Sequence, residues 1–298
     1  MFRHLLHVVL PLALLAAVAR AQDDASFIQP DPTDLPVGWM PTGDTFEPLI
    51  ADPYWPVFNI GYQRYLDDPY LENVVHVAFG DTFPLYRSAN VKALDYFEVG
   101  LQGAVHTVFD QDMPSNDQLN ADFFGGPYLA GRRGLWSGHL RALHRSSHIG
   151  DEFLLNEGAE NGITRENFGF ERIDLYLSRD FTSERGKFAR IYGGFGRTLG
   201  EPNPAEWEEW RLQYGVEVMP TIRLFDIFRP VAAADVQHQQ GNDFKFDLSV
   251  RAGVQVEHPD INGRAVRLLF EYYNGRNVNG QFWEDDLQYA GFGVFINL

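Results

Sequence analysis

The stretch FKFDLSVRAGVQVE, residues 244–257, alternates apolar and polar side chains along its length. The apolar set is Phe246, Leu248, Val250, Ala252, Val254 and Val256, and the polar set is Lys245, Asp247, Ser249, Arg251, Gln255 and Glu257. A period of two residues is that of a β-strand. Strands of soluble proteins usually stop at about five or six residues, whereas a tilted strand needs roughly 9–11 to cross a bilayer. The length of this stretch therefore predicts a membrane β-barrel.

The same alternation returns along the rest of the chain. The twelve predicted strands are 57–66, 74–86, 94–109, 119–131, 135–147, 168–180, 187–199, 211–219, 230–238, 244–257, 264–274 and 286–298. An even number is typical of bacterial outer-membrane barrels. We therefore predict an all-β fold, a single antiparallel up-and-down transmembrane barrel over residues 57–298.

The gaps between the predicted strands are alternately short and long. Residues 87–93 and 132–134 are among the short gaps, which we assign to periplasmic turns, and residues 148–167 form the longest gap, which we assign to an external loop. Outer-membrane barrels have this asymmetry. A soluble barrel or sandwich with an inward apolar face is the alternative, but it leaves the strand length and the turn asymmetry unexplained.

The N-terminal region predicts export. Residues 1–21 combine a basic start at Arg3, an apolar run and the sequence Ala19-Arg20-Ala21, which together indicate a secretory signal peptide. Residues 22–56 are rich in proline and lack strand periodicity, so they form either a periplasmic lead-in or a plug, and we favour the lead-in. The expected location is the bacterial outer membrane.

Composition narrows the chemistry and the partners. The chain has no cysteine, which excludes disulfides and thiolate metal sites. A net charge of −17 makes nucleic acid a poor partner, because phosphate binding needs a concentrated positive surface. The last strand resembles the C-terminal insertion signal of outer-membrane barrels, although it ends in Leu298 instead of phenylalanine. Barrel assembly machinery and membrane lipids, including lipopolysaccharide, are the expected partners, and the oligomeric state is left open.

Charged residues fill the polar face of the predicted strands, which would point into the lumen. These residues are Arg141, Arg145, Arg172, Asp174, Arg211, Glu217, Asp235, Asp247, Arg251, Arg267 and Glu271. The interior of a twelve-stranded barrel is narrow enough for such side chains to fill much of it. We therefore expect a salt-bridged interior in preference to an open pore.

Polar residues interrupt the lipid-facing side of strand 135–147 at its outer end. His144 and Ser146 lie on this face, roughly 6.6 Å apart between Cα atoms, which places a base beside a nucleophile. On the next strand Glu171 lies on the outward face at the same end, and Asn167 lies one step nearer the loop. Either could orient the imidazole. The alternative is a polar rim whose histidines bond loop carbonyls or lipid head groups.

Two groups of loop acids are candidates for a metal site. Asp110, Asp112 and Asp117 in one external loop could bind calcium, which prefers clusters of oxygen ligands, and a solvated loop is the alternative. Asp151 and Glu152 could bind a divalent cation or act on His148.

The motif His144-Arg145-Ser146-Ser147-His148-Ile149-Gly150 is similar to the His-x-Ser pair on the outer surface of outer-membrane phospholipase A and of the lipid A deacylase. The resemblance implies hydrolysis of a lipid ester, with Ser146 as nucleophile, His144 as base and Glu171 or Asn167 as the orienting group. Those enzymes more often have asparagine after the serine, where this chain has Ser147.

The whole mature chain also resembles a bacterial family catalogued as a domain of unknown function. The matching stretches are 51–56 (ADPYWP), 62–65 (YQRY), 144–153 and 271–275 (EYYNG). This resemblance implies an outer-membrane barrel and carries no activity. Three functions are therefore left open: a lipid acyl-ester hydrolase, a non-enzymatic structural or adhesion barrel, and a narrow channel for small solutes.

Overall fold

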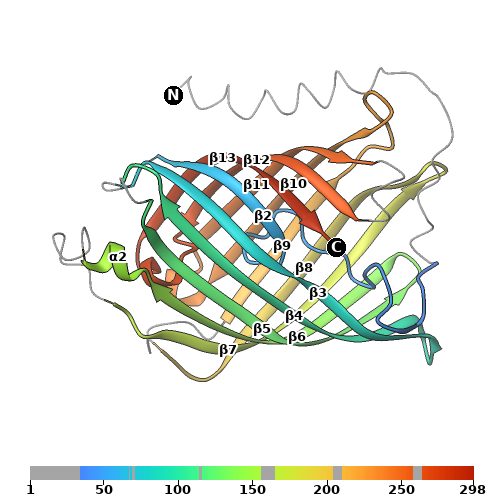
Figure 1. Ribbon diagram of the computed structural model, residues 1–298. Coiled ribbons are helices and arrows are strands. Elements are labelled where there is room, and N and C mark those ends of the chain that lie inside the picture. The colour runs from blue at the N-terminus through green and yellow to red at the C-terminus, as the bar shows by residue number, and fades with distance from the viewer. Residues whose placement is uncertain are drawn as a thin grey trace.

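The computed structural model describes residues 34–298, except 67, 69, 70, 114, 115, 156–164, 204–209 and 258–263, and of residues 201–203 it describes the backbone alone. The predicted signal peptide, 1–21, lies outside the described residues, as do residues 22–33 of the proline-rich segment. Figure 1 shows tilted strands closing into one barrel.

Twelve strands form the barrel wall. They are β2 (Phe58–Tyr65), β3 (Asn73–Val91), β4 (Leu94–Asp110), β5 (Gln118–Arg133), β6 (Trp136–Ile149), β7 (Phe168–Ser183), β8 (Gly186–Asn203), β9 (Trp210–Val218), β10 (Phe228–Gln239), β11 (Phe246–Val256), β12 (Ala265–Arg276) and β13 (Asp286–Asn297). Each pairs antiparallel with its neighbour in sequence, and β13 pairs with β2 to close the sheet. The predicted up-and-down barrel is confirmed.

The largest difference from the predicted strands is at one periplasmic turn. Residues 87–93 were expected to form a turn, yet β3 continues to Val91 and the reversal is made at residues 92–93, where Lys92 has a φ of 55°. A further short strand, β1 (Gly38–Trp39), pairs with this extension outside the closed barrel, opposite Tyr86 and Arg87. The extension was missed because its residues, RSAN, have no apolar alternation.

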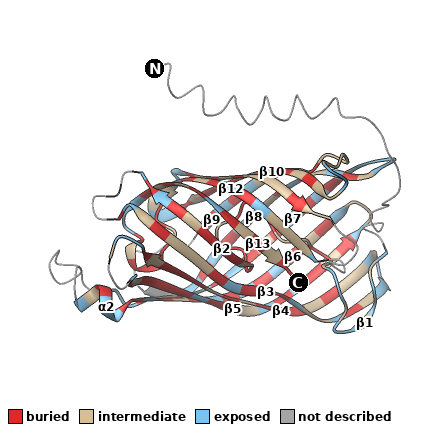
Figure 2. Cartoon of the chain, turned by 45° about the horizontal axis from the view of Figure 1, so that its top comes forward, coloured by how far each residue is buried: buried red, intermediate tan, exposed pale blue. Residues whose placement is uncertain are grey.

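The two faces of the strands have opposite chemistry. On β11 the outward Phe246 is 57% exposed, whereas the inward Asp247 and Arg251 are 2% and 4% exposed. Figure 2 shows this alternation of buried and exposed residues along the strands. An apolar outside around a polar inside is the arrangement of a membrane barrel, and it is the reverse of a soluble barrel. Among the described residues no helix has the length and apolar character needed to cross a bilayer.

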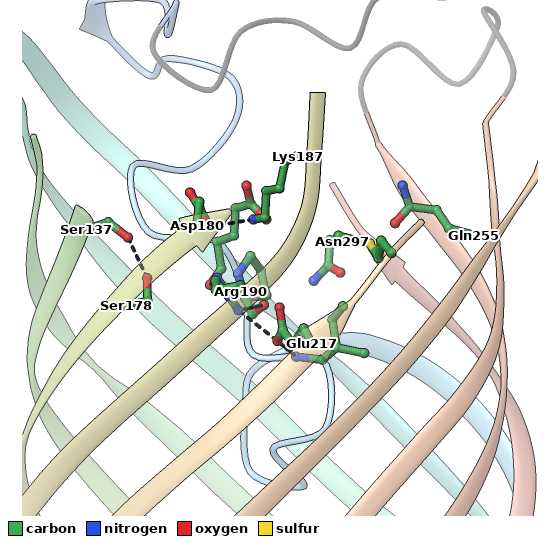
Figure 3. A network of polar contacts seen from close by, with 12 residues as sticks. Ser137, Ser178, Asp180, Lys187, Arg190, Glu217, Gln255 and Asn297 are labelled. Atoms are coloured by element: carbon green, nitrogen blue, oxygen red, sulfur yellow. Dashed lines mark hydrogen bonds and ion pairs between the residues drawn. The ribbon is translucent and has the colours of Figure 1, made fainter. Parts of the chain in front are cut away.

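Buried ion pairs on the lumen side of the wall link neighbouring strands. Arg141 pairs with Asp174 at 2.9 Å and Arg251 with Glu271 at 2.9 Å, as the expected salt-bridged interior requires. Figure 3 shows part of this network, including the ion pair between Arg190 and Glu217, whose atoms lie 2.8 Å apart. Buried charges are tolerated when they are paired in this way.

The described part of the proline-rich segment is a plug from residue 44 onward, and the lead-in favoured by the sequence is wrong for these residues. Its backbone carbonyls accept hydrogen bonds from arginines of the wall: Thr45 from Arg132, Glu47 and Pro48 from Arg190, and Ile50 from Arg251. Phe46 and Trp55 are buried among wall residues that include His139 and Tyr176. The segment lies in the lumen for a physical reason. A proline-rich backbone makes few hydrogen bonds within itself, and here its carbonyls accept hydrogen bonds from arginine.

The connection between β12 and β13 closes the end of the lumen opposite to the one that the plug fills. It contains the short helix η4 (Gly280–Phe282), whose Gly280 and Gln281 are buried. Arg145 donates a hydrogen bond of 2.7 Å to the carbonyl of Val278. The lumen is thus occupied from both ends.

Candidate active site

Strands β6 and β7 bring the predicted site residues to one face of the barrel. In their register His144 lies opposite Glu171, and Ser146 lies opposite Gly169. Residues directly opposite each other on paired strands share a face. The inward neighbours Arg145 and Ser147 are buried, so His144, Ser146 and Glu171 are on the outward side.

His144 and Glu171 are in contact. Nδ1 of His144 lies 3.0 Å from Oε1 of Glu171, and the side chains are 55% and 63% exposed. When the carboxylate accepts from Nδ1–H, the other nitrogen, Nε2, carries the lone pair. His144 is then held in the tautomer that a general base requires.

Ser146 is half-buried and lines a shallow hollow on the outer surface, together with residues that include Gln118, Phe123 and His148. Within the described part of the chain its hydroxyl has no hydrogen-bond partner, so the expected bond to His144 is not made. Catalytic hydrogen bonds are often long or unformed before substrate binds. A bond between the two side chains would require His144 to rotate toward the serine.

Asn167 lies apart from His144. It precedes β7 and is exposed, one step beyond Gly169 on the outward face. The structure brings Glu171, and not Asn167, to the imidazole. Of the two orienting groups that the sequence left open, the carboxylate has the required contact.

The depth of the pair can be estimated along β6. Near the periplasmic end of this strand Arg179 covers the ring of Trp136 at 5.4 Å, an aromatic contact typical of a membrane interface. His144 is eight positions further along the strand, or about 20 Å higher for a strand tilted by roughly 40°. The apolar band of such barrels is about 25 Å tall. If Trp136 marks one edge of this band, His144 lies toward the other edge.

Of the acids proposed for calcium at the β4–β5 connection, Asp110 and Asp117 are buried and Asp112 is exposed. Asn73 donates from its side chain and from its backbone to the two oxygens of Asp112, at 2.7 and 3.0 Å, and these bonds lower the pKa of that carboxyl. Asp151 and Glu152 are exposed in the helix α2 (Asp151–Phe153). Over the described residues, no three His, Asp or Glu side chains converge as a cation site.

One neighbour of the site was missed by sequence reasoning. Gly125 of β5 lies opposite His144, so no side chain stands beside the imidazole on that side. The signal was present, because β5 and β6 are joined by a tight turn and counting back from the Arg133–Trp136 pair gives this register. The β6–β7 register has no such signal, since a long loop joins those strands.

Comparison with known proteins identifies the family. Residues 16–297 match the model of a protein family described as "Protein of unknown function (DUF1207)". The chain belongs to the DUF1207 family. A search of curated protein sequences finds no match to it.

Solved structures similar to this DUF1207 chain include outer-membrane phospholipases. The outer membrane phospholipase A of Escherichia coli superposes with a TM-score of 0.54 at 15% identity, over 83% of this chain and 93% of that one. The Salmonella typhi outer membrane phospholipase, a dimer with bound calcium, gives a TM-score of 0.56 at 14% identity, over 83% and 94%. Identities this low establish the shared fold of outer-membrane barrels and no activity.

Proposed function

We propose that this DUF1207 protein hydrolyses an acyl ester of a membrane lipid, with Ser146 as nucleophile, His144 as general base and Glu171 as the group that orients the imidazole. The observation that carries the proposal is the 3.0 Å contact between His144 and Glu171. His144 is two residues from Ser146 along β6, on the same outward face. Polar side chains on the lipid-facing surface of a barrel raise the free energy of the folded protein unless they reach the lipid head groups, so their presence points to a function.

The chemistry has two steps. Oγ of Ser146 attacks the ester carbonyl carbon while its proton passes to Nε2 of His144, and the proton then goes to the leaving alcohol as the ester bond breaks. Water, deprotonated by the same imidazole, attacks the acyl-serine and releases a fatty acid. Glu171 stabilises the imidazolium formed in each step. The position near the outer edge of the apolar band fits an ester at the junction of acyl chain and head group.

The similar barrels support this choice, because two of them are outer membrane phospholipases. In the proposal the chain is exported by residues 1–21, is inserted into the bacterial outer membrane by the barrel assembly machinery, and acts on phospholipid or on the lipid A part of lipopolysaccharide. Calcium is a proposed cofactor, and the exposed acids Asp151 and Glu152 are the first residues to test for its binding.

A non-enzymatic barrel with a polar rim is the second candidate. It is favoured by one observation, the absence of a hydrogen bond between His144 and Ser146 among the described residues. The channel is disfavoured, because the plug and the β12–β13 connection occupy the lumen from both ends.

The deciding experiment measures fatty-acid release from vesicles of phospholipid and of lipid A by the refolded protein, with and without calcium, beside Ser146→Ala and His144→Ala. His238→Ala is the matched control, since His238 is also a histidine at the outer end of a strand, half-buried and bonded to Tyr214. We expect release to vanish in the first two variants and to persist in the control. No release by the unmodified protein, while a control lipase works, would leave the polar rim as the better account.

A further inference from the structure

The side chain of Gln281 lies behind the candidate site, on the lumen side of the wall. Gln281 belongs to η4 in the β12–β13 connection and is 7% exposed. Its backbone N–H donates to Oδ1 of Asn120 at 3.2 Å, and the same oxygen accepts from the hydroxyl of Ser147 at 2.8 Å. The connection is thereby fixed to β5 and β6.

The amide of Gln281 bridges the outer ends of β6 and β7. Nε2 donates to the carbonyl of Ser147 at 2.9 Å and to that of Glu166 at 3.0 Å, and Oε1 accepts from the N–H of Glu166 at 3.0 Å. The last paired residues of the two strands are Ser147 and Phe168. The side-chain amide thus bonds both strand ends just beyond the point where their own ladder stops.

One bridged residue adjoins the nucleophile of the outward site, and the other lies just before β7, the strand that carries Glu171. Ser147 follows Ser146 directly, and Glu166 directly precedes Asn167. Because neighbouring residues of a strand point to opposite faces, a bond made from the lumen to one fixes the backbone from which the other projects outward. The bridge therefore sets the spacing of the two strand ends that flank the hydroxyl of Ser146.

We propose that Gln281 is a positioning residue for the candidate site, acting through the backbone of Ser147 and Glu166 from inside the barrel. This inference rests on the proposed hydrolysis. Gln281 does not touch substrate, since it is buried on the opposite side of the wall. Its role is to hold the end of β6, which carries His144 and Ser146, at a fixed spacing from β7, which carries Glu171. A displacement of about 1 Å in such a site can cost roughly 100-fold in rate.

The test compares Gln281→Met and Gln281→Glu with the unmodified protein. Methionine keeps the length and loses all three amide bonds, whereas glutamate keeps only the acceptor for Glu166. Gln288→Met is the matched control, because the amide of Gln288 bonds Tyr272 at a distance from the site. Heat-modifiable migration on gels first establishes that each variant is a folded barrel, and the second substitution serves if the first does not fold.

Two readouts decide the matter. We expect kcat to fall about 100-fold in the Gln281 variants with KM within about twofold, and the amide of Glu166 to exchange its hydrogen faster. The control should change neither. Unchanged kcat in a folded variant, or unchanged exchange at Glu166, overturns the positioning role. Absence of hydrolysis by the unmodified protein overturns both proposals. If the unmodified protein hydrolyses lipid and Ser146→Ala does not, while the Gln281 variants keep full kcat, the Gln281 inference alone fails.

Discussion

Nδ1 of His144 lies 3.0 Å from Oε1 of Glu171, although the two residues are 27 positions apart and each is more than half exposed on the outward face of the barrel. An exposed ion pair contributes only about 0–1 kcal/mol to stability. The contact is therefore weak as a structural element, whereas an oriented imidazole beside a serine has a clear chemical use. Substitutions at this pair should therefore lower the activity with little effect on the stability.

Replacement of Glu171 tests this expectation. We expect Glu171→Ala to lower kcat for lipid hydrolysis about 100-fold, because the imidazole loses the group that fixes its tautomer and stabilises its charge. The kcat of Glu171→Gln should lie between those of Glu171→Ala and the unmodified protein, because the amide keeps a hydrogen bond but loses the charge. Fatty-acid release measures the rate, and urea unfolding should show a change of less than about 1 kcal/mol. Full activity in folded Glu171→Ala would remove Glu171 from the mechanism.

Arg251 should be important for stability. It pairs with Glu271 at 2.9 Å inside the lumen and donates to the plug carbonyl of Ile50 at 2.8 Å. Removal of one partner of a buried pair leaves an uncompensated charge, so Arg251→Ala should cost about 3–5 kcal/mol. The exposed pair of Arg64 and Glu72 supplies the control, and Arg64→Ala should cost less than about 1 kcal/mol. Equal effects of the two substitutions in urea unfolding would contradict this view of the lumen.

The unmodified protein should not conduct ions. Wall arginines hold the plug by its backbone, and Gly280 at the other end donates to Asp122 at 3.2 Å. Planar-bilayer recordings in concentrated salt should show no steady open-channel current, with an open porin as the positive control. A stable conductance level in the same preparation would restore the channel function.

The carboxyl of Asp112 gives a pH-dependent prediction in the loop between β4 and β5. Its two bonds from Asn73 lower its pKa in the folded protein. A lowered carboxyl pKa stabilises the fold above the ordinary aspartate value of about 3.9, and this contribution is lost as the pH falls through the lowered value. Asn73→Ala should return the pKa of Asp112 toward its ordinary value in an NMR titration. An unchanged titration curve would show that these bonds do not form in solution.

Much of the wall followed from the sequence. The period of two identified twelve strands because each side chain has only two environments, lipid or lumen, and these differ sharply in polarity. The same alternation placed His144, Ser146 and Glu171 on the outward face. A count across the short turn between β5 and β6 would also have placed Gly125 opposite His144, but this neighbour was missed.

The register of β6 and β7, the plug and the Gln281 bridge were decided by tertiary structure alone. The contact between His144 and Glu171 depends on a register set across a long loop, where sequence offers no count. Residues 44–55 have no periodicity, and their place in the lumen comes from hydrogen bonds that their backbone accepts from arginines on distant strands. Backbone carbonyls are the same in every residue, so sequence does not mark which of them an arginine will bind. The alternation of side chains therefore determined the strands of the wall. The segments that fill the lumen were determined by contacts that form only when the barrel closes.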